Sequence, residues 1–194
     1  MKLQIFLDLD RTIGDTDSAI EDLIGEEDFE LLLHRDQVVS NMLWKKVSDN
    51  PIFWDNIKPF PYASALYNKC IELCPDTFIL SAYPGSFRGN DINICKLKKK
   101  EWVEKYFGTE QSSRVIVTAS CEKHHYVDTD SPLLHVLIDD RADTIKLWNK
   151  FGGFGIVHRT FNDTMKALSF LSYACKKAKD ARSFLEFLEK SGRL

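Results

Sequence analysis

The chain lacks any long apolar run. Its opening apolar segment, residues 3–9, is too short and too acidic for a signal peptide, and no later stretch approaches membrane-spanning length. Cysteine is also scarce. The five cysteines are odd in number and include no C-x-x-C pair, which argues against a disulfide framework and against a zinc site. We therefore expect a cytoplasmic protein with reduced cysteines.

A strong charge of either sign is missing as well. The 26 basic and 29 acidic residues leave a formal net charge of -3, which gives no general reason to expect nucleic acid as the main partner. There is no internal repeat and no low-complexity segment. The 194 residues suffice for one core domain with a small insert, and such a chain can bury most of its apolar surface.

What the chain does have is a strand-like opening segment that ends in acidic residues. Residues 3–9 include β-branched and aromatic members and predict a buried strand, with Asp8 and Asp10 where it should stop. Carboxylates beside a core are costly unless compensated, usually by a hard cation such as Mg2+. Since alternate residues of a strand share a face, both aspartates should leave on the same side. This D-x-D-x-T pattern indicates a candidate nucleophile paired with an acid or base; a strand running into a solvated acidic turn is the alternative.

Strand-like and helix-like segments alternate along the rest of the chain. Alternation of this kind predicts a parallel sheet with right-handed crossovers, and here a Rossmann-like, three-layer α/β fold with strand order about 5-4-1-2-3. The four further strands are expected at residues 77–80, 114–118, 133–138 and 154–157. Helices are expected at residues 62–74, 96–107, 142–150, 163–177 and 180–190, with a loop at 82–91 and a polar connection at 119–132.

One stretch interrupts this alternation. Residues 16–60 carry apolar side chains at roughly helical spacing and are closed by Pro51, Pro59 and Pro61. We interpret them as a small helical cap inserted after the first strand. The core would then consist of residues 1–15 and 61–194.

Polar residues follow three of the predicted strands. Asp8 and Asp10 end the first, Ser81 ends the second, and Asp139 and Asp140 end the fourth. In open parallel sheets, ligands bind beyond the carboxyl ends of the strands, near the point where strand order reverses. With the first strand central and these neighbours beside it, the five side chains should converge on one site.

These motifs together resemble those of the haloacid dehalogenase superfamily of phosphohydrolases. D-L-D-R-T at residues 8–12 looks like the first motif, Ser81 the second, a lysine before the fourth strand the third, and I-D-D at residues 138–140 the fourth. The motif-level resemblance runs from about residue 2 to 160.

Within that superfamily, the chain is most similar to the 5'(3')-deoxyribonucleotidases. The stretches that carry this resemblance are K-K-E-W-V-E-K-Y-F-G at residues 99–108, L-I-D-D-R-A-D at 137–143 and, more loosely, I-F-W-D-N-I-K-P-F-P at 52–61.

The resemblance implies two-step hydrolysis of a phosphomonoester with Mg2+ as cofactor. Asp8 would attack phosphorus and form an aspartyl-phosphate, while Asp10 would protonate the leaving oxygen and later take a proton from water. These roles require the pKa of Asp10 to be raised relative to that of Asp8. Mg2+ would be held by the Asp8 carboxylate, the Asp10 backbone carbonyl and Asp139, with Asp140 a possible further ligand or an acceptor that orients a neighbour.

Phosphate binding is the role that the resemblance implies for Ser81 and a lysine. Lys123 matches the third-motif position of the deoxyribonucleotidases and is preferred over Lys99, which could still reach substrate. Lys99 lies in the basic run at residues 96–100, and we expect that run to be mostly a solvated helix face.

The cap would cover the site, exclude water and select the substrate. Phe53 and Trp54 lie where the deoxyribonucleotidases have aromatics that stack on a base, and Trp44 is a looser match; each could equally be cap core. The expected partner is a small phosphomonoester, namely a nucleoside monophosphate and preferably a deoxyribonucleotide. We expect the protein to be a monomer or a homodimer and to have no membrane partner. The alternatives are a phosphatase of another small phosphomonoester or of nucleic acid 3'-phosphate ends, and an inactive relative that binds a nucleotide or a protein.

Three positions depart from the pattern of the family. Arg11 stands where a glycine is usual, and it would be strained if the position needs positive φ. Ala82 replaces a common hydroxyl residue, and Thr16 stands where an aromatic often helps to hold the base. His124 and His125 are expected to be loop histidines, because a hard carboxylate site does not favour imidazole.

Overall fold

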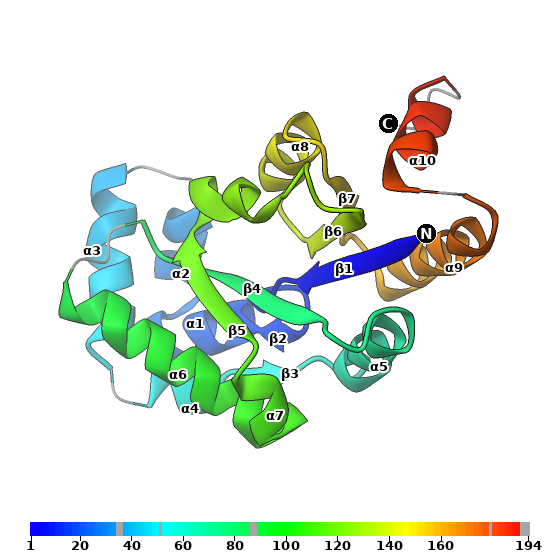
Figure 1. Cartoon of the computed structure of the whole chain (residues 1–194). Coiled ribbons are helices and arrows are strands. Elements are labelled where there is room, and N and C mark those ends of the chain that lie inside the picture. Colours follow the sequence, from blue (N-terminus) through cyan, green and yellow to red (C-terminus); the bar gives the residue numbers. More distant parts are fainter. Residues whose placement is uncertain (34–36, 51, 86–88, 179, 191–194) are drawn as a thin grey trace.

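The structure is a computed structural model that describes residues 1–33, 37–50, 52–85, 89–178 and 180–190 (Figure 1). A five-stranded parallel sheet in the order β5-β4-β1-β6-β7 forms its centre. The strands are β1 (Lys2–Leu7), β4 (Phe78–Tyr83), β5 (Val115–Ala119), β6 (Leu133–Asp139) and β7 (Phe154–Val157). These are the predicted strands one to five along the chain, so the α/β class and the predicted strand order are confirmed.

The sheet buries apolar side chains on both faces. In β1, Leu3, Ile5 and Leu7 join the larger core, whereas Phe6 joins a smaller core with Trp148. Burial on both faces explains why the strands are nearly continuous apolar runs. β1 pairs with β6 along its whole length and with β4 at its C-terminal end. The residue that follows β1 is thereby held in the middle of the sheet edge.

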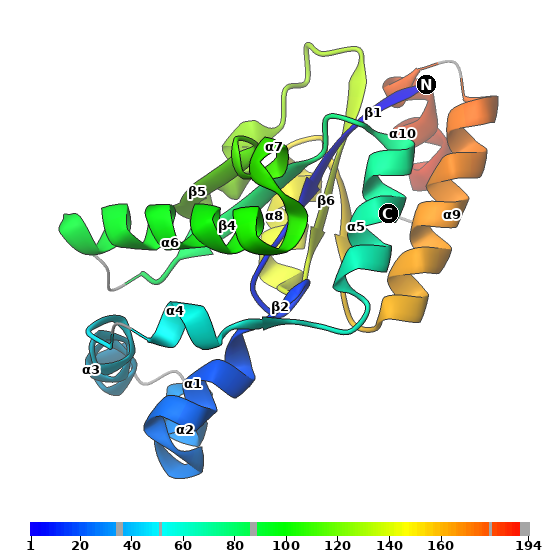
Figure 2. The ribbon, with the colours of Figure 1, turned by 90° about the horizontal axis from the view of Figure 1, so that it is seen from below.

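Helices cover the two faces unequally. The larger core receives α5 (Ala63–Leu73), α6 (Asn90–Phe107), α9 (Phe161–Lys177) and α10 (Ala181–Lys190), and α5 and α9 lie side by side (Figure 2). The smaller core receives α8 (Ala142–Lys150) and the 3-10 segment η1 (Ser120–Tyr126). The short helix α7 (Thr109–Ser112) follows α6. The result is a three-layer arrangement of helices, sheet and helices.

Most predicted helices agree with the structure to within about two residues, and two segments differ. Helix α6 begins at Asn90 rather than at residue 96, and its added turn packs Ile92 and Cys95 against the core. The polar connection predicted at residues 119–132 contains η1, which apolar periodicity did not reveal. In the loop predicted at residues 82–91, Ala82 and Tyr83 belong to β4, Asn90 and Asp91 belong to α6, and residues 86–88 lie outside the described residues.

The residues between β1 and α5 form helices that gather beyond the C-terminal ends of the strands (Figure 2). They are α1 (Thr16–Ile24), α2 (Glu26–Leu33), α3 (Gln37–Ser48) and α4 (Phe53–Asn56). An antiparallel ribbon joins them to the sheet, with β2 (Gly14–Asp15) paired to β3 (Lys58–Pro59). The division into a core and a cap of residues 16–60 stays a prediction, and Pro51, expected to help close the cap, lies outside the described residues.

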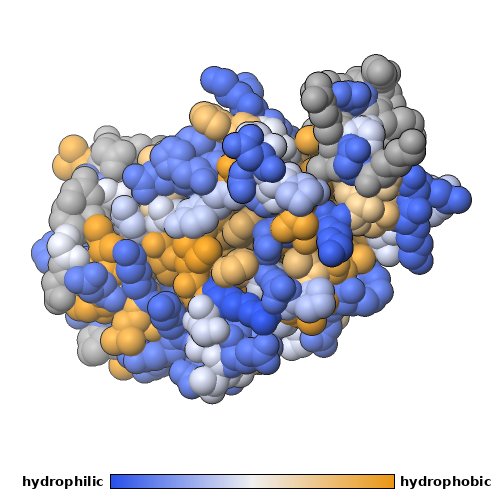
Figure 3. Space-filling view, in the orientation of Figure 1, coloured by the Kyte–Doolittle hydropathy of each residue, from blue (hydrophilic) through white to orange (hydrophobic). Residues whose placement is uncertain are grey.

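The surface is mixed in character. Figure 3 shows a mainly hydrophilic face, with apolar side chains gathered toward its middle and left. Among the described helices, none is long and apolar enough to span a membrane.

Candidate active site

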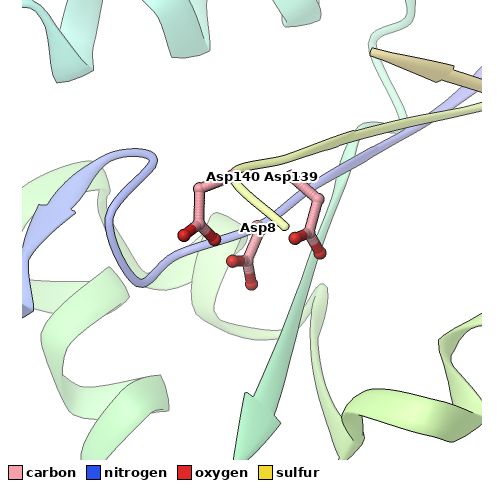
Figure 4. Close-up of side chains that lie close together, drawn as sticks. All are labelled: Asp8, Asp139 and Asp140. Carbon is pink, nitrogen blue, oxygen red and sulfur yellow. The ribbon is translucent and has the colours of Figure 1, made fainter. Parts of the chain in front are cut away.

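The carboxyl ends of β1 and β6 bring three aspartates together. Asp8 follows β1, Asp139 ends β6, and Asp140 comes next. Because the two strands pair in register up to their ends, the residues that follow them meet. One carboxylate oxygen of each aspartate lies within 4.8 Å of one from each of the other two, and the three side chains point into one space (Figure 4). We call this set the carboxylate cluster.

Lys123 of η1 is the cation of this cluster. Its Nζ donates to Asp8 Oδ1 and to Asp139 Oδ2, each at 2.7 Å, and the lysine is 2% exposed. The other oxygen of Asp139 accepts from the backbone N–H of Arg141 at 2.9 Å. Asp8 Oδ2 differs, because among the described residues no donor bonds to it. One oxygen of Asp8 is thus fixed and the other is available for chemistry.

Asp10 belongs to a second group. Its Oδ1 accepts from Thr16 Oγ1 at 2.8 Å, and its Oδ2 accepts from Ser81 Oγ at 3.0 Å and from Lys99 Nζ. Lys99 also donates to Ser81 Oγ and to the Ala82 carbonyl, both at 2.6 Å. We call Asp10, Thr16, Ser81 and Lys99 the Asp10 group.

The carboxylate cluster disfavours further negative charge. Burial raises the pKa of Asp8 to about 8, with Lys123 opposing the shift and Asp139 adding to it. Burial likewise raises the pKa of Asp140 to about 6, with Asp139 adding and Arg11 opposing. The protein therefore leaves these carboxylates short of positive charge.

The Asp10 group has the opposite balance. Burial alone would raise the pKa of Asp10, but the charge of Lys99 and hydrogen bonds from Lys99, Thr16 and Ser81 hold it below its ordinary value. The roles implied by the resemblance need the reverse order, with the pKa of Asp10 above that of Asp8. The protein groups by themselves place the pKa of Asp10 below that of Asp8. The carboxylate with which Lys99 pairs is that of Asp10, whereas Lys123 is shared between the two buried carboxylates of Asp8 and Asp139.

Lys99 corrects one sequence-based expectation. The run at residues 96–100 was expected to be mostly a solvated face, yet Lys99 is 2% exposed, whereas Lys96 and Lys100 are exposed. Lys99 lies four residues from buried Cys95 and four from buried Val103, on the buried face of α6. Both candidate lysines therefore lie in the site, Lys123 with the cluster and Lys99 with Asp10.

The arrangement of acids also differs in part from the predicted metal ligands. The side chains brought together are Asp8, Asp139 and Asp140, so the residue considered only a possible ligand is part of the cluster. The carboxylate of Asp10 turns instead toward Thr16, Ser81 and Lys99. The role predicted for Asp10 uses its backbone carbonyl, and that role stays a prediction.

The donor set fits a hard divalent cation. With all four carboxylates of Asp8, Asp10, Asp139 and Asp140 ionised, they exceed the two buried ammonium groups by two negative charges, which a divalent cation would balance. All three side-chain donors of the cluster are oxygens, the ligands that Mg2+ prefers. His124 and His125, predicted to be loop histidines, lie in the 3-10 segment η1, and among the described residues they belong to no group of three or more metal-ligating side chains.

A cavity of about 910 Å³ opens beside these groups. Asp8, Asp10, Lys99, Lys123 and Asp140 line it, together with side chains from α1, α3, α4 and α8. Its size suits a small organic ligand rather than a single ion. The acidic groups thus lie at the wall of a ligand-sized space.

The aromatic residues expected to contact a base line this cavity. Phe53 and Trp54 are 1% and 7% exposed and pack edge to face with ring centroids 4.9 Å apart. Trp44 of α3 lines the same wall. Both interpretations left open by the sequence, cap core and ligand contact, are compatible with these positions, because each buried ring also borders the cavity.

Arg11 has the positive φ that the sequence left open. Its φ is 58°, where side chains other than glycine are strained. Its Nε bonds to Asp17 Oδ1 of α1 at 2.6 Å, and its side chain borders the cavity. At the position where the haloacid dehalogenase pattern usually has glycine, this chain therefore has Arg11, whose guanidinium contacts α1.

Sequence reasoning missed two contributions to the site. Thr16 was noted only for the aromatic it replaces, yet it bonds to Asp10. Its place at the first residue of α1, just after the N-cap Asp15, could have indicated that its side chain lies near the strand end. The basic side chains of α8 that line the cavity, Lys146 and Lys150, were also missed, although their four-residue spacing in a predicted helix was visible.

Comparison with known proteins adds little beyond this geometry. No family model matches the chain, and no curated protein matches it significantly. Among solved structures, the L-2-haloacid dehalogenase from Xanthobacter autotrophicus is similar, with a TM-score of 0.49 and 10% sequence identity. That similarity covers 84% of this chain and 80% of the other.

Proposed function

We propose that the chain is a Mg2+-dependent phosphomonoester hydrolase that forms an aspartyl-phosphate on Asp8. The observation that carries the proposal is the state of Asp8, which is buried at a strand end beside a ligand-sized cavity. One of its oxygens is held by Lys123, and the other has no donor among the residues that the structure describes. A carboxylate oriented in this way is suited to nucleophilic attack. The four motifs that resemble those of the haloacid dehalogenase superfamily agree with this chemistry.

The reaction would proceed in two displacements. In the first, Asp8 Oδ2 forms a bond to phosphorus, the ester oxygen leaves, and Asp10 supplies the proton that this oxygen takes. In the second, water attacks the phosphorus of the aspartyl-phosphate, Asp10 takes a proton from that water, and inorganic phosphate leaves with Asp8 restored. Dividing the hydrolysis in this way replaces one difficult step by two easier ones.

Ser81 and Lys99 support the role of Asp10. Both bond to Asp10 Oδ2, and both are donors that phosphoryl oxygens would compete for. Substrate binding would therefore relieve Asp10 of two of its three contacts, which favours the protonated form that the first step needs. Thr16 would keep Asp10 oriented through Oδ1.

The carboxylate cluster would hold Mg2+, with Asp8, Asp139 and Asp140 as the side chains nearest to it. A bound Mg2+ would stabilise negative charge on the phosphoryl oxygens and keep Asp8 ionised. Lys123 would remain the fixed cation of the site, orienting Asp8 and Asp139.

The substrates that we propose are nucleoside monophosphates, preferably deoxyribonucleotides. Phe53, Trp54 and Trp44 on the cavity wall would offer apolar surface to a planar base. The partner is thus a small molecule, and the protein would act as a monomer or a homodimer, as predicted from the sequence.

The test is phosphate release from nucleoside 5'- and 3'-monophosphates and from sugar phosphates, with Mg2+ or with EDTA. We expect release that needs Mg2+ and is fastest with nucleotides. Asp22→Asn, at an exposed aspartate of α1, serves as the control and should retain full activity. Release that persists in EDTA would overturn the metal dependence, and equal turnover of all substrates would overturn the nucleotide assignment.

A further inference from the structure

The cavity has two walls of different chemistry beyond the carboxylate cluster and the Asp10 group. On the side of α1, α3 and α4, the lining is mainly apolar, with Ile20, Trp44 and Trp54, and its polar members are Thr16 and Asp17. On the side of α8, the wall carries Lys146 and Lys150. We call these two lysines the basic wall.

The basic wall brings two positive charges to the cavity. Within the described part of the chain, neither Lys146 nor Lys150 forms a salt bridge or a side-chain hydrogen bond. Asp143, three residues before Lys146, is already paired with Arg141 through bonds of 2.6 and 3.1 Å. The helix therefore presents two uncompensated positive charges to the cavity.

Helix stability accounts for only part of this arrangement. Lys150 is in the last turn of α8, where a positive charge is favourable. Two like charges four residues apart, however, repel each other slightly along a helix. Other cations of the chain, such as Lys69 and Lys98, pair with an acid three residues away on their own helix. Lys146 and Lys150 lack that compensation on the side of the cavity.

The distance between the basic wall and the acidic groups suits a small molecule. Helix α8 starts at Ala142, two residues after Asp140, and a helix rises about 1.5 Å per residue. Lys146 and Lys150 therefore lie about 6 and 12 Å along the axis from the start of α8. A ligand whose phosphate reaches Asp8 could place a second anionic group, separated by a sugar-sized spacer, at the basic wall.

We propose that Lys146 and Lys150 form a second anion-binding subsite, so that the substrate is a small phosphomonoester that carries a second phosphate group. Two ammonium groups balance the two charges of a phosphate dianion, whereas a carboxylate ligand would neutralise only one of them. The second phosphate is bound and only the phosphate at Asp8 is hydrolysed. This inference rests on the proposed function and narrows its substrate class.

The kinetic test compares matched substrates that differ by one phosphate. The pairs are a nucleoside 5'-monophosphate with its 3',5'-bisphosphate, and glucose 6-phosphate with glucose 1,6-bisphosphate. In the parent, kcat/KM should be about tenfold higher for the bisphosphate of the preferred pair, as two partly exposed charge contacts would give. In the double variant Lys146→Gln with Lys150→Gln, this ratio should fall toward one through KM, with kcat on the monophosphate unchanged.

The matched control is Lys96→Gln with Lys100→Gln. These two exposed lysines are also four residues apart on a helix, but they do not line the cavity. Replacing them changes the net charge by the same amount as the Lys146 and Lys150 variant and should leave the ratio of kcat/KM between bisphosphate and monophosphate unchanged. An unaltered ratio in the Lys146 and Lys150 variant, or the same loss in the control, would overturn the subsite.

A binding measurement separates this inference from the proposed function. Calorimetric titration of Asp8→Asn with the same bisphosphate and monophosphate needs no turnover. Tighter binding of the bisphosphate that depends on Lys146 and Lys150 supports the subsite even if no phosphate is released. Equal binding of the two ligands overturns it even if the enzyme is an active phosphatase. Preference for a 5'-phosphorylated dinucleotide over the bisphosphate would overturn the small-molecule assignment in favour of a nucleic acid end.

Discussion

Asp8 and Asp10 lie two residues apart and have opposite surroundings. Asp8 faces two other buried or half-buried carboxylates and shares Lys123 with Asp139, and its pKa is raised to about 8. Asp10 has Lys99 and two hydroxyl donors to itself, and its pKa is lowered. The comparison teaches that donors act together with burial to decide which acid carries its charge easily: within the described residues, buried Asp8 has one donor, whereas half-buried Asp10 has three.

The largest expected effects come from removing each acid in turn. Asp8→Asn and Asp10→Asn should each lower phosphate release more than about 10³-fold, because one removes the nucleophile and the other the proton carrier. Their effects on stability should differ. Asp10→Asn leaves Lys99 buried without its carboxylate and should lower the free energy of unfolding by roughly 3 kcal/mol. Asp8→Asn leaves Lys123 paired with Asp139 and should not lower it.

Urea unfolding in EDTA, with phosphate release measured on the same preparations, checks this contrast. The control is Asp22→Asn, which should match the parent in both measurements. Equal losses of stability in Asp8→Asn and Asp10→Asn would contradict the difference between the carboxylate cluster and the Asp10 group.

The next largest effect should be a pH dependence of stability in EDTA. Since the folded pKa of Asp8 is raised from 3.8 to about 8, its contribution to stability is full below about pH 4 and is lost as pH rises to 8. The free energy of unfolding should therefore fall by a few kcal/mol over that range. His135 and His158 act in the opposite sense, because burial lowers the pKa of each and their contribution is lost as pH falls below 6.5.

The pH profile of Asp8→Asn isolates the contribution of Asp8. Subtracting it from the profile of the parent removes the contribution of both histidines. A difference between the two profiles that stays flat from pH 4 to 8 would contradict the raised pKa of Asp8.

Magnesium should stabilise the folded protein through the carboxylate cluster. At a concentration 100-fold above its Kd, a ligand that binds only the folded state adds about 2.7 kcal/mol. Asp140→Asn should weaken Mg2+ binding more than Thr16→Val does, because Asp140 belongs to the cluster and Thr16 only to the Asp10 group. Calorimetric titration with MgCl2 measures both. A greater loss in Thr16→Val would show that the division between the two groups is wrong for the metal.

The smallest expected effect concerns the turn that joins the two groups. Arg11 has a φ of 58°, so Arg11→Gly should be more stable than Arg11→Ala by about 1 kcal/mol, because both variants lose the ion pair with Asp17 and only glycine relieves the strain. Thermal unfolding of the two variants measures the difference. At the exposed helical position Lys100, the same pair of substitutions should give the opposite order, with alanine more stable by about 1 kcal/mol. Equal stability of the two Arg11 variants would contradict the strain.

Much of the fold could be predicted because its signals are local. Apolar runs of five to seven residues bounded by Asp, Ser or Gly identify strands such as β1 and β6, and the alternation with helices implies a parallel sheet. The short β2 and β3 ribbon escaped prediction, because two residues per strand have no detectable period. The start of α6 was placed late, because its first turn is polar and is followed by only a few inward side chains.

The candidate site was predicted less completely than the sheet. The convergence of Asp8 with Asp139 follows from strand ends in one parallel sheet. The burial of Lys99 could have been inferred from its spacing to Cys95 and Val103, but a run of lysines favoured the solvated interpretation. The pairing of each lysine with its acid depends on how α6 and η1 lie against the sheet, and no local pattern specifies that.

The sequence by itself determined the order of strands and helices and which acids stand at the strand ends, because these depend on local periodicity and chain direction. Only the tertiary structure decided which lysine meets which aspartate, that Asp140 joins Asp8 and Asp139, and that α8 presents Lys146 and Lys150 to the same cavity. The physical reason is that charge balance in a buried site depends on contacts of 3 Å between segments far apart in the chain, and such contacts form only when the layers pack together.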